Sequence, residues 1–166
     1  MTLDPAGGTC TNHTTPFTLI FRGSTTLPDT TSCTRDGYVL LGWTRNPSLT
    51  TPEHLLTTVV ARPGTLTAVW GALPTAPEQV DVIANLFCTQ NCTTALILWP
   101  TNTTTSDTTL ITVDNTTATC ELTGDVFGFT WCWITGLTPT TTHTTSIAWR
   151  NTHGTGPATT TTFPLN

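Results

Sequence analysis

Four histidines and ten carboxylates are the side chains of this 166-residue chain best suited to acid–base chemistry. The histidines are His13, His54, His143 and His153, and none of them stands in an HExxH spacing. The chain contains no GxSxG elbow and no glycine-rich loop that would cradle a phosphate. Two carboxylates could act together as in glycosidases, but no segment brings two of them to one cleft. The sequence therefore predicts no catalytic residue, and we expect a protein that is not an enzyme.

Six cysteines are the second chemical feature, and we expect all of them to form disulfides. They are Cys10, Cys33, Cys88, Cys92, Cys120 and Cys132. Their spacing alone leaves several connectivities open. The CxxxC pair could instead bind zinc, but no second cysteine or histidine pair stands nearby at ligand spacing, so we predict no metal and no cofactor. Disulfides are typical of an oxidising compartment, which points to an exported protein.

The charge pattern argues against two classes of partner. All five basic residues are arginines, charged residues make up 9% of the chain, and the net charge is −5. Nucleic-acid binding needs clustered lysines and arginines, so we expect no nucleic-acid partner. The longest apolar run, "ALILW", is far shorter than the ~20 residues of a membrane helix, so we expect no membrane insertion. No signal peptide is visible at the N-terminus, and we interpret the chain as a piece of a longer exported protein.

Threonine dominates the composition and predicts a mainly β fold. The chain holds 47 threonines, which are β-branched and suit pleated strands. In the first part we expect strands at residues 1–5, 17–21, 38–43 and 66–70. One short helix is predicted over residues 51–56, where Thr51 would be the N-cap and Pro52 the first helical residue. Glycine and prolines after Trp70 indicate a linker at residues 73–76.

Residues 1–72 carry a pattern of spaced motifs. "LDPAGGTC", "TTLP", "CTRDGYVLLGW" and "LTAVW" follow one another in this order. Together they resemble the Listeria-Bacteroides repeat, a small β-grasp module of the internalin B-repeat type. The resemblance implies that Tyr38, Trp43 and Trp70 anchor the core of this module. It also implies a disulfide between Cys10 and Cys33.

Residues 77–166 carry a second, independent pattern. "ALILWP", "ITGLTP" and "NTHGTGPA" stand at the spacing of a bacterial fibronectin type III domain, which this segment resembles. The resemblance implies an Ig-like β-sandwich with Trp99 in its core and His143 at a position usually held by an inward tyrosine. It further implies a disulfide between Cys120 and Cys132. Cys88 and Cys92 are then left to close a tight loop.

The stretch "FTWCWI" at residues 129–134 is apolar on both sides of a strand. In the register of the resembled family, Cys132 and Ile134 face the core, so Trp131 and Trp133 point outward. The same register leaves two leucines of "ALILW" outside, in the neighbouring strand of the same sheet. The candidate interface residues are therefore Leu96, Leu98, Phe129, Trp131 and Trp133.

A contiguous apolar patch of this kind usually marks an interface, and several occupants are open. One is the first module folding back over the sheet, another is an identical subunit, and a third is a surface glycan stacking on the tryptophans. The remaining alternative is that the tryptophans are merely exposed. Both resemblances favour a non-enzymatic extracellular segment of a bacterial cell-surface or secreted protein. It would act as a stalk or spacer, or as an assembling fibre subunit; a carbohydrate- or host-binding adhesin module is the alternative.

Overall fold

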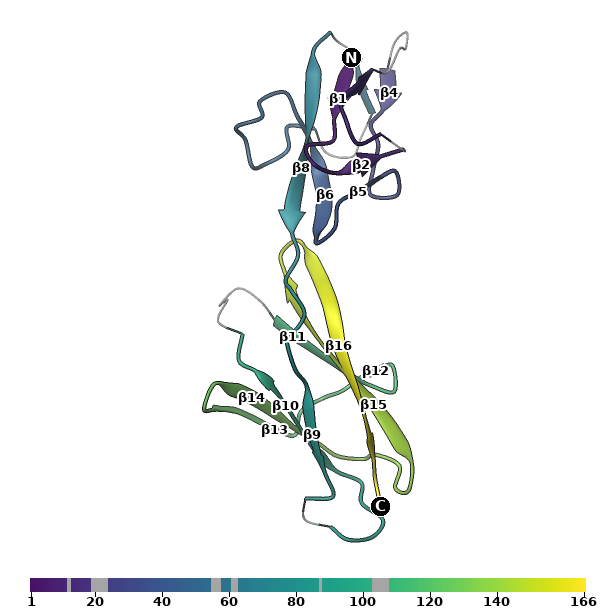
Figure 1. Cartoon of the computed structure of the whole chain (residues 1–166), viewed down its shortest axis with the longest axis vertical. Helices are drawn as coiled ribbons and strands as arrows, with labels where there is room; N and C mark the ends of the chain where they lie inside the picture. Colours follow the sequence, from purple (N-terminus) through teal and green to yellow (C-terminus); the bar gives the residue numbers. More distant parts are fainter. Residues whose placement is uncertain (12, 19–23, 55–57, 61–62, 87, 103–107) are drawn as a thin grey trace. The chain divides into compact units, whose positions relative to one another are not determined.

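The protein consists of two compact β units. The computed structural model describes residues 1–166 except 12, 19–23, 55–57, 61–62, 87 and 103–107. The chain divides into Met1–Leu73 and Pro74–Asn166 (Figure 1). The mainly β fold is confirmed, because the described residues form strands and turns and contain no helix. Accordingly, no helix within the described ranges is long and apolar enough to cross a membrane.

The first unit is built on one mixed sheet and two small ribbons. Its strands are β1 (Thr2–Asp4), β2 (Thr9–Cys10), β3 (Phe17–Thr18), β4 (Ser24–Thr26), β5 (Cys33–Thr34), β6 (Tyr38–Thr44), β7 (Thr58–Val60) and β8 (Thr65–Ala72). The main sheet has the order β3-β1-β8-β6, with β1 and β8 parallel and the other pairs antiparallel. β2 pairs with β5, and β4 pairs with β7.

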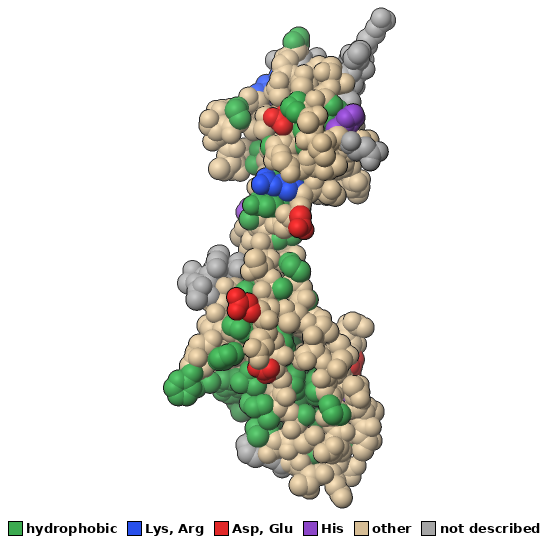
Figure 2. Space-filling view, viewed as in Figure 1, with side chains coloured by type: hydrophobic (Ala, Val, Ile, Leu, Met, Phe, Trp, Pro, Cys, Tyr) green, Lys and Arg blue, Asp and Glu red, His purple; other side chains and the backbone are tan. Residues whose placement is uncertain are grey.

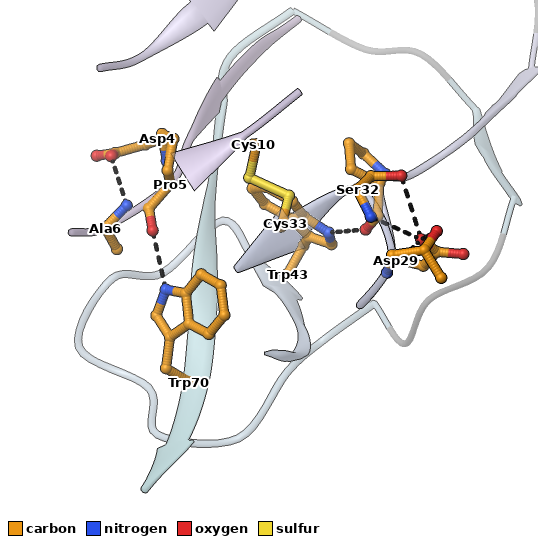
Figure 3. Close-up of a disulfide and its surroundings, with 11 residues drawn as sticks. Asp4, Pro5, Ala6, Cys10, Asp29, Ser32, Cys33, Trp43 and Trp70 are labelled. Carbon is orange, nitrogen blue, oxygen red and sulfur yellow. Dashed lines mark hydrogen bonds between the residues drawn. A yellow bond between two sulfur atoms is a disulfide. The ribbon is translucent and has the colours of Figure 1, made fainter. Parts of the chain in front are cut away.

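The core of the first unit forms around Trp43, which is fully buried. Its indole N–H donates a hydrogen bond to the carbonyl of Pro28 at 2.9 Å, so the one polar group of the ring is satisfied. The Cys10–Cys33 disulfide joins β2 to β5 within the same core (Figure 3). Trp70 lies partly buried at the edge of this core and donates to the carbonyl of Pro5 at 2.8 Å.

Two expectations for the first unit are wrong. Tyr38 is not a core anchor, because its side chain is 38% exposed and packs under the guanidinium of Arg35, 4.0 Å from the ring centre. Residues 51–54 do not begin a helix, because the backbone N–H and C=O of His54 pair with those of Trp43 beside β6. Hydrogen bonds to a strand edge replace the bonds that a helical turn would need. The rest of the predicted helix, residues 55–56, lies outside the described residues, as do residues 19–21 of the predicted strand at 17–21.

The second unit is a pair of four-stranded antiparallel sheets. Its strands are β9 (Asp81–Ala84), β10 (Ala95–Pro100), β11 (Thr108–Val113), β12 (Thr116–Thr117), β13 (Leu122–Val126), β14 (Phe129–Ile134), β15 (Thr142–Asn151) and β16 (Gly154–Pro164). One sheet has the order β13-β14-β10-β9 and the other has the order β12-β11-β15-β16. In Figure 1, β15 and β16 form the long hairpin that ends the chain.

Both sheets of the second unit contribute to one core. From the first sheet, Ile97, Trp99 and Cys132 are buried, and from the second sheet Ile147 and Phe163 are buried in the same cluster. The strands alternate as a half-buried strand should: in β10 every second residue from Ala95 is buried, and the residues between are partly exposed. The first sheet therefore has a second, outer face.

Candidate interaction surface

The outer face of the first sheet begins with the alternation of β14. Cys132 and Ile134 are buried in the core, whereas Trp131 and Trp133 are only partly buried and lie on the opposite side of the strand. Phe129 has the same parity as the two tryptophans and is 37% exposed. The three aromatic side chains therefore line one side of β14.

Strand β10 brings its two outward leucines to the same place. Leu96 lies directly opposite Trp133, and Leu98 lies directly opposite Trp131. In antiparallel strands such pairs stand with their Cβ atoms roughly 5 Å apart, so they contact each other across the sheet. The structure thus places the five predicted interface residues on one face of one sheet.

Strand β13 enlarges this face and is not among the strands expected from the sequence. It pairs with β14 so that Leu122 stands opposite Trp133, Gly124 opposite Trp131 and Val126 opposite Phe129. Leu122 is 64% exposed and Val126 is 43% exposed. The signal was present in "LTGDVFGFTW", where the outward positions of the first strand are apolar or glycine and a Phe-Gly pair supplies the turn.

At the other edge of the sheet, β9 continues the apolar surface and then ends it. Ile83 lies opposite Leu96 and is 41% exposed. The next outward position is Asp81, which lies opposite Leu98 and accepts a hydrogen bond from the side chain of Gln79 at 2.5 Å. A charged residue therefore borders the apolar face along β9. Figure 2 shows hydrophobic side chains gathered on this flank of the second unit, over the β13–β14 hairpin.

A groove of about 540 Å³ runs over this face, and every described residue that lines it is apolar. The outer groove, as we name it, is lined by Leu86, Leu96, Leu98, Leu122, Val126, Trp131 and Trp133. Among the residues that the structure describes, no carboxylate, amide or basic side chain belongs to this lining. The groove can therefore take up an apolar group, and it offers no ion pair to a charged one.

The floor of the outer groove depends on a glycine. A Cβ atom at position 124 would stand 2.9 Å from two atoms of the Trp131 indole, closer than side chains approach. Without a side chain there, the indole can lie against the backbone of β13. Gly124 therefore sets the position of Trp131 on the outer face.

All six cysteines are paired as expected: two pairs are those that the resemblances implied, and the third is the pair left over. The disulfides are Cys10–Cys33, Cys88–Cys92 and Cys120–Cys132. Cys132 lies in β14 directly between the two outward tryptophans, so its bond holds the inner side of the same strand. Within the described part of the chain, no group of three or more His, Cys, Asp or Glu side chains is placed to hold a metal ion.

A second cluster of titratable groups surrounds His143, at the start of β15. The ring is 4% exposed; Nδ1 lies 2.6 Å from Oδ2 of Asp114, and Nε2 lies 2.8 Å from the carbonyl of Thr138 and 2.9 Å from the hydroxyl of Thr141. Burial lowers the pKa of His143, but the bonds to the Thr138 carbonyl and the Asp114 carboxylate outweigh it, so the pKa is raised. The backbone N–H of Thr144, together with His143, lowers the pKa of Asp114.

This cluster has the outline of a Thr-His-Asp triad, but its hydrogen bonds occupy both nitrogens of the ring. The Thr138 carbonyl and the Asp114 carboxylate can only accept hydrogen bonds, so both ring nitrogens of His143 donate. The hydroxyl of Thr141 donates to the same Thr138 carbonyl at 2.7 Å. While both ring nitrogens donate, the ring cannot take a proton from that hydroxyl. Instead, His143 ties the segment before β15 to the turn after β11.

No family model, curated protein or solved structure matches this chain.

Proposed function

We propose that this chain is a non-enzymatic structural segment of a bacterial cell-surface or secreted protein. In this proposal a β-grasp-like repeat module and a fibronectin type III-like sandwich act as a stalk or spacer. The outer face of the sheet β13-β14-β10-β9 is the surface through which the segment associates with neighbouring domains or identical subunits.

The observation that carries the proposal is the continuous apolar character of that outer face. Ile83, Leu122, Val126 and Phe129 are each more than a third exposed. They lie around four partly buried side chains of the same face, those of Leu96, Leu98, Trp131 and Trp133. Exposed apolar residues are ordinary when scattered singly, but a contiguous patch over four strands is typical of an interaction site. Covering this face would remove the tryptophans from water, which favours association.

The three disulfides support the extracellular part of the proposal. They are compatible with an extracellular or secreted protein, because thiols in a reducing cytosol stay unpaired. Each unit holds at least one of them, so both units would gain stability from oxidation.

A carbohydrate-binding adhesin module is the second candidate, and the outward indoles of Trp131 and Trp133 favour it. Flat aromatic side chains can stack on sugar rings. Sugar hydroxyls, however, also need hydrogen-bonding partners, and the lining of the outer groove supplies neither carboxylates nor amides. The apolar lining favours association with another protein surface over a glycan.

Light scattering and negative-stain microscopy of Trp131→Ala and Trp133→Ala variants test the proposal. The wild-type chain should form species larger than the monomer, and each substitution should reduce them. Leu49→Ala is the matched control, because Leu49 is 40% exposed but belongs to the first unit and not to the outer face. Equal assembly in all four proteins would refute the assembly role, and glycan-array binding that both tryptophan variants lose would favour the adhesin.

A further inference from the structure

The side chain of Phe127 is not buried against the described residues of its own chain. It is 98% exposed, the most exposed of the large apolar side chains described. It is the first of the two residues that join β13 to β14, and both have positive φ, 49° at Phe127 and 82° at Gly128. Such a two-residue turn is type I′, which favours Asn, Asp or Gly at its first position. A bulky aromatic residue is therefore disfavoured there by its backbone and by its exposure to water.

The hairpin end that carries Phe127 is held in place. The backbone N–H of Thr101 donates to the carbonyl of Gly128 at 2.8 Å, which ties the turn to the end of β10. On the inner side of the hairpin, the hydroxyl of Thr130 donates to the carboxylate of Asp125, and its oxygen lies 3.2 Å from the hydroxyl of Thr101. Phe127 is thus presented on a fixed support, and Figure 2 shows hydrophobic side chains projecting where Figure 1 places this hairpin end.

The outer groove is an apolar site in which an aromatic side chain such as that of Phe127 could be buried. Its volume of about 540 Å³ is ample for a phenyl ring, since a cavity of about 150 Å³ lined by similar side chains already holds benzene. Its lining of four leucines, one valine and two tryptophans matches an aromatic side chain and pairs with no charge. Phe127 does not fill the groove of its own chain, because a side chain that is 98% exposed contacts almost nothing.

We propose that the occupant of the outer groove is Phe127 of a second copy of this chain, and that two copies exchange this residue reciprocally. Val126 lines the groove and is the neighbour of Phe127, so donor and acceptor are parts of one continuous surface. A continuous surface that carries both parts is self-complementary, and a two-fold axis satisfies both copies at once. The inference rests on the proposed function, because it names the partner of the same outer face.

The size of the face indicates a weak, concentration-dependent pair. Four strands of four to six residues cover roughly 350 Å² of flat sheet. Stable complexes bury about 800 Å² on each partner. The two inserted rings therefore provide a large share of the contact, and the pair should be sensitive to substitution at position 127.

Phe127→Asn tests this directly, because it removes the ring and leaves the turn better suited to its backbone. The variant should melt at the same or a higher temperature than the wild type, since Asn-Gly is the preferred type I′ pair. In sedimentation velocity its dissociation constant should rise about 100-fold. Each pair loses the burial of two phenyl rings, and each ring contributes roughly a factor of ten to the affinity. Leu49→Asn removes an apolar side chain that is 40% exposed from the first unit, and this variant should associate as the wild type does. Unchanged association of Phe127→Asn would overturn the inference.

Comparison with Trp131→Ala separates this inference from the proposed function. If Phe127→Asn and Trp131→Ala both abolish association, the proposed function and the inference both stand. If only Trp131→Ala abolishes it, the outer face is an assembly surface but Phe127 is not its occupant, and the inference falls alone. If neither substitution changes association, the proposed function and the inference are both refuted.

A photo-crosslinking amino acid at position 127 identifies the occupant. With a mixture of isotopically light and heavy chains, crosslinks should join light to heavy chains and should map to the lining of the outer groove. Crosslinks confined to single chains and leading to residues 1–73 would show that the first unit takes this place, and would overturn the pairing. Capture of lipid vesicles in place of a second chain would overturn it as well.

Discussion

Gly124 of β13 stands directly opposite Trp131 of β14, and a Cβ atom at position 124 would lie 2.9 Å from the indole. The ring thus occupies the space that any other residue would need for its side chain. The most exposed strand of the sheet is therefore built to let a tryptophan lie across it.

Gly124→Ala should displace Trp131 and destabilise the second unit by about 1–3 kcal/mol, the usual cost of forcing an extra methyl group into a packed site. Urea unfolding measures the loss, and near-UV circular dichroism reports the changed environment of the indole. Leu122→Ala on the same strand is the control and should change stability by less than about 0.5 kcal/mol, because Leu122 is 64% exposed. A Gly124→Ala variant as stable as the wild type would contradict the contact.

The disulfides should differ in what they contribute, because they close loops of different length. Replacing both members of Cys120–Cys132, which are 12 residues apart, should cost about 3 kcal/mol. Replacing both members of Cys88–Cys92, which are 4 residues apart, should cost about 2 kcal/mol. Urea unfolding of the two double Cys→Ala variants gives this order, and the reverse order would show that loop length does not set their contribution.

The stability of the second unit should fall as the pH rises above about 6.5. The folded-state pKa of His143 is raised, so its contribution is complete below the unfolded value of about 6.5 and is lost as the pH rises through the folded value. Asp114 has a lowered pKa, so its contribution is present above about 3.9 and is lost as the pH falls through its folded value. The pair should therefore stabilise the unit most between about pH 4 and pH 6.5.

Thermal unfolding across this pH range checks the role of His143. His143→Gln should remove most of the decline above pH 6.5, whereas His153→Gln should keep it, because the ring of His153 lies exposed after β15. A decline of equal size in His143→Gln and the wild type would assign the pH dependence to another group.

A glycan array should give no binding to the wild-type chain that depends on the outer face. The reason is the lining of the outer groove, which gives sugar hydroxyls no carboxylate or amide partner. Sugar binding that is lost in both Trp131→Ala and Trp133→Ala would contradict this expectation.

Much of the outer face could be anticipated from the sequence, because a strand alternates with a period of two. Once Cys132 was placed inside, Trp131 and Trp133 had to lie outside, and the same rule placed Leu96 and Leu98. The structure agrees on these positions; that they contact a partner stays a prediction. The disulfides Cys10–Cys33 and Cys120–Cys132 agree with what the two family resemblances implied, and Cys88–Cys92 is the pair that was left.

The features that the sequence did not predict depend on tertiary contacts, which the alternation of apolar and polar residues along a strand does not encode. Strand β13 contains Gly124 and Asp125, which are poor strand formers, and it exists because it pairs with β14. Tyr38 was expected inside because a resemblance carries over a residue's position but not its exposure. The helix expected from Thr51 fails because the backbone of His54 pairs with Trp43, a contact eleven residues away in sequence.

Sedimentation velocity of the oxidised wild-type chain, from micromolar to millimolar concentration, tests the assembly role of the outer face most directly. The sedimentation coefficient should rise with concentration from that of the monomer toward that of a larger species, and Trp131→Ala should stay at the monomer value throughout. A wild-type chain that sediments as a monomer at every concentration would contradict the assembly role.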